Sequence, residues 1–214
     1  MSKSFAVIGL GRFGRCVAME LSDLGADVLA IDSDEDKINS VADYVTCAIN
    51  IDVCDVDALK NAGISNMDAV IVSMGDCLES SIMSVITAKE LGVPLVIAKA
   101  RDEVTGNIIS KVGADRIVFP ERESGIRLSH RLMSADVLDY FDLSDTVSMV
   151  KILPKSEWVG KSLVELNLRK EYRINIVGIW DNDKINVSID PKEPLSSDKP
   201  LLVIVAKNDL KRLS

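Results

Sequence analysis

The run from Phe5 to Gly14, FAVIGLGRFG, constrains the fold of this chain more than any other stretch. Apolar residues typical of a buried strand lead into a G-x-G-x-x-G pattern, and apolar residues at helical spacing follow it. In such a unit Gly9 permits a tight turn, Gly11 lets the backbone approach a ligand, and Gly14 lets the helix pack closely on the strand. Because the helix start presents unpaired N–H groups, the pattern is typical of a phosphate-binding loop.

A second apolar run, residues 28–31, ends at Asp32, eighteen residues after Gly14. At this distance the dinucleotide-binding fingerprint has a carboxylate that accepts hydrogen bonds from ribose hydroxyls. The alternative for Asp32 is a solvated strand end, or an N-cap of the helix expected to start near Glu35.

Composition excludes several classes of protein. The 214 residues are 47% apolar, enough for one large domain or for a medium domain with a small one. A net charge of −8 argues against nucleic acid as a partner, because such partners need a basic surface. The apolar runs are strand-sized and no signal-peptide pattern is visible, so we expect a cytoplasmic protein.

The cysteines and the single histidine do not suggest a metal or catalytic centre. Cys16, Cys47, Cys54 and Cys77 have no C-x-x-C spacing and no neighbouring histidine. We therefore expect reduced, mostly packed thiols rather than a zinc site. His130 lies in a charged, helix-like segment and is interpreted as structural.

Strand-like runs at 5–8, 28–31, 44–48, 68–74, 95–98 and 116–119 alternate with helix-like segments. This rhythm predicts an α/β fold, a Rossmann-like doubly wound parallel sheet, over residues 1–141. We expect its last helix to run from Pro120 to about Phe141 and to pack outside the sheet, most naturally on a partner subunit.

A polar turn at 142–146 marks the expected start of a second, small α+β domain, residues 142–214. We expect strands at 147–153, 174–180, 184–189 and 201–206, a helix at 163–168, a turn at 181–183 and a closing helical turn at 208–213. Because this segment has no histidine and no nucleophile–base pair, it is interpreted as a binding or dimerising unit.

Further candidates follow the other strands at the carboxyl edge of the sheet, where ligands bind in doubly wound folds. Asp52 follows the third strand and could reach a purine, although an acid here could equally cap the helix expected at 56–62. Lys99 and Arg101 follow the fifth strand and bring positive charge toward a phosphate, or simply end a strand in solvent.

Together these features resemble the cytoplasmic gating subunits of the Trk/Ktr potassium-uptake systems. Such TrkA- or KtrA-like proteins combine a regulator-of-potassium-conductance (RCK, or KTN) domain with a small C-terminal RCK (TrkA-C) domain. The resemblance covers nearly the whole chain and rests on residues 9–14, 28–32, 68–72, 113–117, 120–121 and 159–169.

The resemblance implies an adenine-nucleotide site for ATP or ADP, formed by Gly9, Gly11, Arg12, Phe13, Gly14, Asp32, Ser33, Asp52, Val53, Ser73, Gly75, Lys99 and Arg101. In the family's pattern Arg12 reaches the terminal phosphates, including those of a neighbouring subunit's nucleotide; otherwise it is a surface arginine. Glu121 corresponds to a carboxylate that holds a divalent or sodium cation at the dimer interface, with helix capping as the alternative.

The resemblance also implies a cyclic di-AMP site in the second domain, at Leu163, Val164, Leu168, Arg169, Asn175 and Ile176. Asn167 stands where relatives often carry an acid. A plain hydrophobic dimer interface is the alternative for this surface.

The expected function is that of a non-enzymatic ligand switch. Homodimers would assemble into a higher ring, expected to be an octamer, at the inner face of the cell membrane. There ATP/ADP exchange would gate a potassium-translocating subunit of the TrkH or KtrB kind. One alternative is an NAD(H)-binding Trk subunit, and a more remote one is an NAD-dependent oxidoreductase, because NAD or NADH would use the same loop and Asp32.

Overall fold

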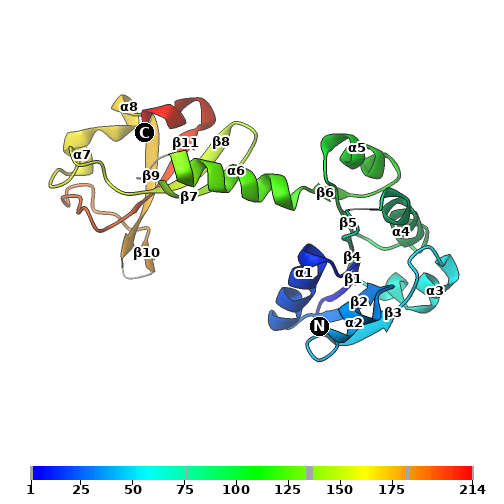
Figure 1. Cartoon of the computed structure of the whole chain (residues 1–214). Helices are drawn as coiled ribbons and strands as arrows, with labels where there is room; N and C mark the ends of the chain where they lie inside the picture. Colours follow the sequence, from blue (N-terminus) through cyan, green and yellow to red (C-terminus); the bar gives the residue numbers. More distant parts are fainter. Residues whose placement is uncertain (1, 76, 134–136, 182–183, 214) are drawn as a thin grey trace. The chain divides into compact units, whose positions relative to one another are not determined.

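The computed structural model describes residues 2–75, 77–133, 137–181 and 184–213. The chain forms two compact units, residues 1–121 and 122–214, whereas we expected the division at 141/142. Each unit is built on its own sheet (Figure 1).

The first unit has a six-stranded sheet in the order β3-β2-β1-β4-β5-β6, and every pairing is parallel. Its strands are β1 (Ser4–Ile8), β2 (Asp27–Asp32), β3 (Cys47–Asn50), β4 (Ala69–Val72), β5 (Val96–Lys99) and β6 (Arg116–Val118). Between them lie α1 (Arg12–Asp23), α2 (Glu35–Asn39), α3 (Val56–Asn61), the 3₁₀ turn η1 (Ile64–Asn66), α4 (Leu78–Glu90) and α5 (Glu103–Lys111). This confirms the predicted doubly wound fold.

Alternation along the central strands explains why both faces of this sheet are covered by helices. Ala6 and Ile8 of β1 belong to one apolar cluster, whereas Val7 belongs to another that includes Ala18 of α1. Because successive side chains of a strand point to opposite faces, a continuously apolar strand must be buried on both sides. The strand order reverses between β1 and β4, where such sheets bind their ligands.

The third strand lies later than predicted, at Cys47–Asn50 instead of 44–48. Its register aligns Leu29 with Cys47 and Asp32 with Asn50, so β2 and β3 end level with each other. Tyr44 is exposed in the preceding turn. The bounds of β3 are determined by its hydrogen bonds to β2, and the apolar pattern of residues 44–48 does not contain this information.

The second unit has an antiparallel sheet in the order β10-β9-β11-β8-β7. Its strands are β7 (Val137–Asp142), β8 (Val147–Ile152), β9 (Ile174–Asp181), β10 (Lys184–Asn186) and β11 (Leu201–Ala206). Its helical elements are α6 (Pro120–Met133), which begins in the first unit, α7 (Leu163–Leu166), α8 (Leu168–Glu171) and the 3₁₀ helix η2 (Lys207–Arg212). The turn expected at 181–183 lies mostly outside the described residues.

The helix predicted to reach Phe141 is wrong in its last part, because α6 ends at Met133 and residues 137–142 form β7. Tyr140 pairs with Val150 of β8, and its hydroxyl lies 2.7 Å from both Asp142 Oδ1 and Ser148 Oγ. The rest of the predicted helix, residues 134–136, lies outside the described residues. The strand is favoured over a continued helix because it buries the Tyr140 ring while its hydroxyl forms hydrogen bonds.

Two smaller predictions also need correction. The helix expected at 163–168 is split at Asn167, whose positive φ of 44° ends α7 and starts α8. The four cysteines are free, as expected, but all are exposed rather than packed.

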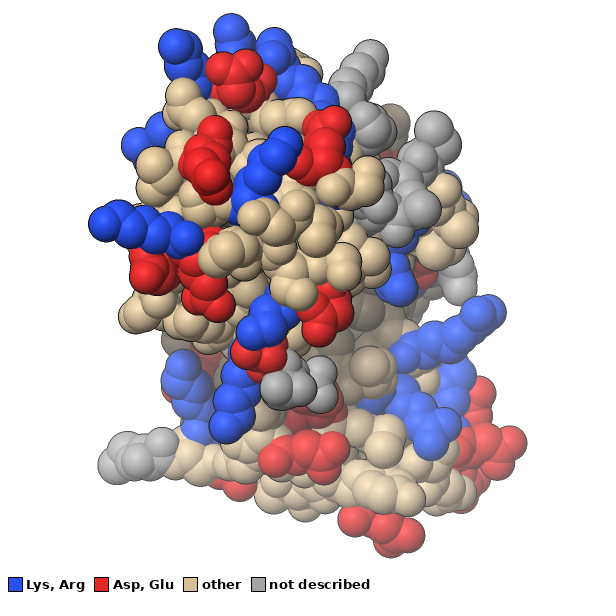
Figure 2. Space-filling view, turned by 90° about the vertical axis from the view of Figure 1, so that its left-hand side faces the viewer, with Lys and Arg blue, Asp and Glu red and all other residues tan. Residues whose placement is uncertain are grey.

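On the face drawn in Figure 2 basic and acidic side chains are interspersed, and that face shows no broad basic area.

Candidate functional site

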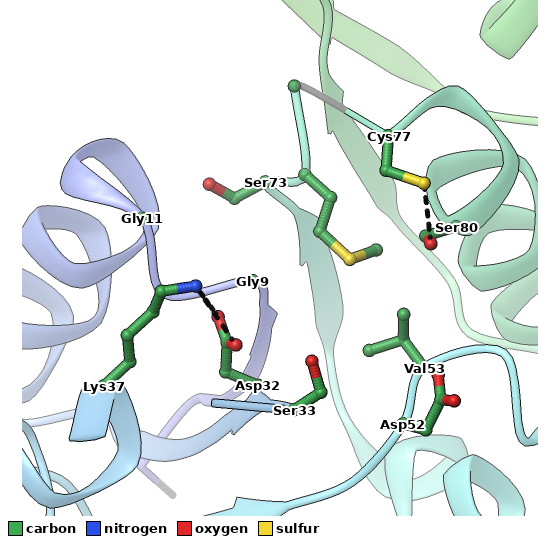
Figure 3. Close-up of a pocket in the computed structure, with 12 residues that line it drawn as sticks. Gly9, Gly11, Asp32, Ser33, Lys37, Asp52, Val53, Ser73, Cys77 and Ser80 are labelled. Carbon is green, nitrogen blue, oxygen red and sulfur yellow. Dashed lines mark hydrogen bonds and ion pairs between the residues drawn. The ribbon is translucent and has the colours of Figure 1, made fainter. Parts of the chain in front are cut away.

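A cavity of about 270 Å³ lies at the carboxyl ends of β1, β2 and β4, where the strand order reverses (Figure 3). It is lined by Gly9, Gly11, Asp32, Ser33, Lys37, Asp52, Val53, Ser73, Met74, Gly75, Cys77 and Ser80. Eight of these residues were predicted from the sequence.

The three glycines of the loop differ in what a side chain at each position would meet. Gly9 has a φ of +92°, and a Cβ there would lie 2.6 Å from the Met74 side chain. A Cβ on Gly14 would overlap the carbonyl oxygen of Gly9, so only glycine lets α1 start this close to the loop. Gly11 differs, because a Cβ there would meet nothing within 4 Å. The space above Gly11 is therefore open to a ligand.

The start of α1 faces this loop without a competing side chain. Gly11 is its N-cap, no side chain caps the helix, and its first turn contains no acidic residue. The first hydrogen bond within the helix runs from Arg15 N–H to Gly11 C=O. The earlier N–H groups have no acceptor within the helix, and their partial positive charge suits an anion.

Asp32 connects the ribose end of the predicted site to the glycine loop. The residue is 7% exposed, and its carboxylate accepts hydrogen bonds from Leu10 N–H at 2.6 Å and from Asp34 N–H at 2.9 Å. The N-cap of α2 is Asp34, which accepts from Asp36 N–H, so the capping alternative for Asp32 is wrong.

Lys37 is a lining residue that the sequence reasoning missed. Its Nζ lies 3.4 Å from Asp32 Oδ1 (Figure 3). The same nitrogen lies 3.7 Å from Asp34 Oδ2. Lys37 lies on α2, which follows β2 directly, so its side chain returns to the carboxyl end of β2 at Asp32. It partly neutralises the acid that a ribose would approach.

The opposite wall comes from β4, the β3–α3 loop and α4. Asp52 accepts from Cys54 N–H, whereas the N-cap of α3 is Asp55, which accepts from Ala58 N–H. The helix-capping alternative for Asp52 is therefore wrong. Met74, Cys77 and Ser80 also line this wall and were not predicted.

Ser73 brings a polar atom without a partner to the same cavity. Its residue is 6% exposed, and its hydroxyl has no hydrogen-bond partner within the part of the chain that the structure describes. Since buried hydroxyls nearly always pair, this hydroxyl is suited to a ligand.

Five of the predicted nucleotide residues do not line the cavity: Arg12, Phe13, Gly14, Lys99 and Arg101. Gly14 lies behind the loop, where it contacts Gly9. Arg12 is exposed at the first position of α1. Arg101 pairs with its neighbour Asp102 at 3.1 Å. Lys99 passes beside Gly75 and bonds to Glu121 instead.

The pair of Lys99 and Glu121 lies at the end of β5 and the start of α6. Lys99 Nζ donates to Glu121 Oε1 at 2.7 Å, and this hydrogen bond is the main cause that lowers the pKa of Glu121. The charge of Arg12 contributes in the same direction. Among the described residues no group of three or more histidine, cysteine or acidic side chains forms a metal-binding cluster.

A second cavity, of about 310 Å³, lies in the second unit. It is lined by Leu163, Asn167, Leu168, Arg169, Ile174, Asn175 and Ile176, which include five of the six residues predicted there. Arg169 Nε donates to Asn175 Oδ1 at 2.6 Å. The sixth, Val164, is 61% exposed and lies outside the lining.

A parallel sheet with a glycine loop and an acid at its switch point gives the first unit the architecture of Rossmann-type domains, a class that commonly binds nucleotides. The TrkA-N domain family matches residues 5–120, and the TrkA-C domain family matches residues 147–214. The chain belongs to the TrkA/Ktr family of potassium uptake proteins.

The sequence relatives agree. "Ktr system potassium uptake protein C" of Bacillus subtilis is 41% identical over 212 residues, covering 99% of this chain and 96% of the relative. "Ktr system potassium uptake protein A" of Vibrio alginolyticus is 33% identical, over 97% of this chain and 94% of the relative. In none of the described helices is there a segment long and apolar enough to span a membrane.

Solved structures support the fold alone. The NAD-bound GsuK channel superposes with a TM-score of 0.66 at 13% identity, over 98% of this chain and 38% of that channel chain. The GsuK RCK domain gives the same TM-score at 15% identity, over all of this chain and 47% of that one.

Proposed function

We propose that this chain is the nucleotide-binding regulatory subunit of a Ktr/Trk-type potassium uptake system. The observation that carries the proposal is the cavity in which the open space above Gly11, the uncapped start of α1 and the acid Asp32 meet. The names of its relatives connect such a chain with potassium uptake.

The ligand we propose is ATP or ADP. Its phosphates would lie on the glycine loop and the N–H groups of α1, and its ribose hydroxyls would donate to the remaining lone pairs of Asp32. Its adenine would lie between Asp52 and Val53 on one side and the β4–α4 wall on the other. Ser73 Oγ supplies a further hydrogen-bonding group inside the cavity.

The position of Arg12 supports a role toward a neighbouring subunit. Its side chain is exposed and does not line the cavity of its own chain. We propose that it reaches the terminal phosphate of a partner's ATP, where a guanidinium distinguishes ATP from ADP through charge and bidentate hydrogen bonding. Lys99 and Arg101 would complete the cationic edge of that site, and Phe13 would add an apolar contact beside Arg12.

We also propose that Glu121 shares a divalent or sodium cation with the phosphates at the dimer interface. A carboxylate beside a triphosphate needs a cation to relieve repulsion. Lys99 neutralises Glu121 in the single chain, so binding of a metal would require the lysine to exchange partners.

For the assembly we propose a homodimer that associates into a ring, with an octamer as the expected size. The exposed apolar side chains of α6, Ile126, Leu128 and Leu132, are 37%, 55% and 76% exposed and suit a subunit contact. The ring would lie at the cytoplasmic face of the membrane, beneath a potassium-translocating partner of the TrkH or KtrB kind.

Gating needs no chemistry on the nucleotide. A ligand that binds one ring shape tenfold more tightly than another supplies about 1.4 kcal/mol per site, and several sites add to a decisive bias. In the second unit, the cavity with Arg169 and Asn175 would bind cyclic di-AMP as a further effector.

The test is a titration of the purified chain with ATP, ADP, NADH and cyclic di-AMP, following melting temperature and particle size together. We expect ATP and ADP to raise the melting temperature and only ATP to change the particle. If NADH alone binds and the particle is indifferent to adenine nucleotides, the NAD(H)-binding alternative replaces the ATP switch.

A further inference from the structure

Two cysteines lie beside one serine hydroxyl at the wall of the cavity that faces the glycine loop. Cys77 Sγ is 3.0 Å from Ser80 Oγ, and Cys54 Sγ is 3.5 Å from the same oxygen. Cys77 lines the cavity, and Cys54 follows Val53, which also lines it. Figure 3 shows Cys77 and Ser80 across the cavity from Gly11.

The surroundings of Cys77 favour its thiolate. Cys77 is the N-cap of the thirteen-residue helix α4, and no side chain caps that helix. Its hydrogen bonds to Ser80 are the main causes that lower its pKa. An exposed thiol at a helix N-terminus with a lowered pKa is the kind that reacts with oxidants.

We propose that Cys54 and Cys77 form a redox-active dithiol at the nucleotide cavity, which closes to a disulfide when a peroxide is the oxidant. Formation of the disulfide does not depend on the proposed function, whereas its expected effect on nucleotide binding does. The shared contact with Ser80 Oγ means that bond formation requires rotation of the two side chains and displacement of one hydroxyl.

The reaction balances with hydrogen peroxide as the only co-reactant. The Cys77 thiolate attacks one peroxide oxygen, the O–O bond breaks, and the departing hydroxide takes up a proton to become water. The Cys54 thiolate then attacks the sulfur of the Cys77 sulfenic acid and displaces hydroxide, which also becomes water. Two thiols and one peroxide give one disulfide and two waters.

The bond would close part of the cavity. It joins the β3–α3 loop, which carries Asp52 and Val53, to the start of α4, which carries Cys77 and Ser80. Pulling these two walls together narrows the space in which the proposed adenine lies. We expect the disulfide form to bind ADP at least tenfold more weakly than the reduced form.

The chain supplies its own controls, because Cys16 and Cys47 are also free and exposed but lie outside the cavity lining. The reduced wild-type chain is treated with one equivalent of hydrogen peroxide, remaining thiols are alkylated, and peptides are identified by mass spectrometry. We expect a dithiothreitol-sensitive peptide that links residues 54 and 77 within one chain, while Cys16 and Cys47 remain alkylated. A chain with Cys54→Ser should retain an oxidised Cys77 without any such link.

Cys54 and Cys77 recovered fully alkylated, or Cys77 linked only between chains, would overturn the proposal. ADP binding is then measured by calorimetry on the reduced, oxidised and re-reduced Cys16→Ser/Cys47→Ser chain. Equal affinity in the oxidised form would refute closure of the cavity. If the reduced chain binds no nucleotide at all, the proposed function fails, whereas the linked peptide still decides whether the disulfide forms.

Discussion

Alanine at two glycines of the same loop should have opposite consequences. Gly14→Ala places a methyl group into the carbonyl oxygen of Gly9 and within 2.8 Å of Ser73 Oγ. To make room for this methyl group, the loop backbone at Gly9 or the start of α1 would have to shift, and a shift of one displaces the other. Gly11→Ala places the same methyl group in open space, on a backbone with φ of −62° and ψ of −176° that alanine adopts without strain.

The expected energies follow from these contacts. Overpacking of a rigid site costs about 1–3 kcal/mol, or roughly 4–12 °C of melting temperature at about 4 °C per kcal/mol for a domain of this size. For Gly11→Ala, the weaker N-cap costs less than about 1 kcal/mol, and the stiffer unfolded chain returns about 0.4–1 kcal/mol. Its melting temperature should stay within about 2 °C of wild type.

Nucleotide binding should rank the same two variants differently. In Gly11→Ala the methyl group occupies the space that a phosphate needs, so we expect ADP affinity to fall at least tenfold, about 1.4 kcal/mol. The assay is thermal unfolding without ligand, followed by ADP calorimetry on whichever variants remain folded. Gly11→Ala that melts as low as Gly14→Ala, or that binds ADP like wild type, would refute this reading of the loop.

Three further changes test other parts of the chain. Arg12→Ala should weaken ATP and leave ADP affinity unchanged in calorimetry, and equal losses would exclude phosphate sensing. Asp115 accepts hydrogen bonds from Val96 N–H and from Lys89 Nζ, and these two bonds, in that order of size, lower its pKa below the usual 3.8. The ionised carboxylate therefore stabilises the folded chain above pH 3.8. This stabilisation disappears as pH falls through the pKa of the folded state. Asp115→Asn should therefore cost about 1 kcal/mol in urea unfolding at pH 7 and progressively less as pH falls below 3.8, and a loss that does not change with pH would refute this. Arg169→Ala should abolish cyclic di-AMP binding, whereas Val164→Ala, outside the cavity, should not; equal effects would place the ligand elsewhere.

The first sheet was predictable because its information is local. Each central strand is apolar on both faces, so the strands stand out in the sequence, and alternation with helices determines that they run parallel. The carboxyl ends of parallel strands lie at one edge, so Gly9, Asp32, Asp52 and Ser73 could be placed in one site without coordinates.

Residues contributed by helix faces were missed for the opposite reason. Lys37 and Ser80 reach the cavity only because α2 and α4 pack at particular rotations against the sheet. A weak signal existed for Ser80, which lies three residues after Cys77 and therefore on the same face at the start of α4. No comparable signal marks Cys54, whose proximity depends on a separate loop.

Residues 137–142 show where a local pattern cannot decide. Their apolar positions satisfy a helical stripe almost as well as a strand, and charged residues precede them as they would in a continuing helix. Tyr140 decides between helix and strand. Its ring is buried in the apolar core of the second unit, and its hydroxyl contacts Asp142 and Ser148. The partner strand β8, which begins five residues after β7 ends, supplied the missing information.

Asp32 explains why the fingerprint of glycines and a distant acid works as one unit. Both of its oxygens already accept backbone N–H groups, one from Leu10 in the glycine loop and one from Asp34 at the start of α2. A ribose must therefore use the remaining lone pairs, which Lys37 approaches at 3.4 Å. Under the proposed function, a nucleotide ribose at Asp32 would displace Lys37 while leaving the loop anchored. Through the hydrogen bond from Leu10 N–H, the acid holds the glycine loop independently of any ligand.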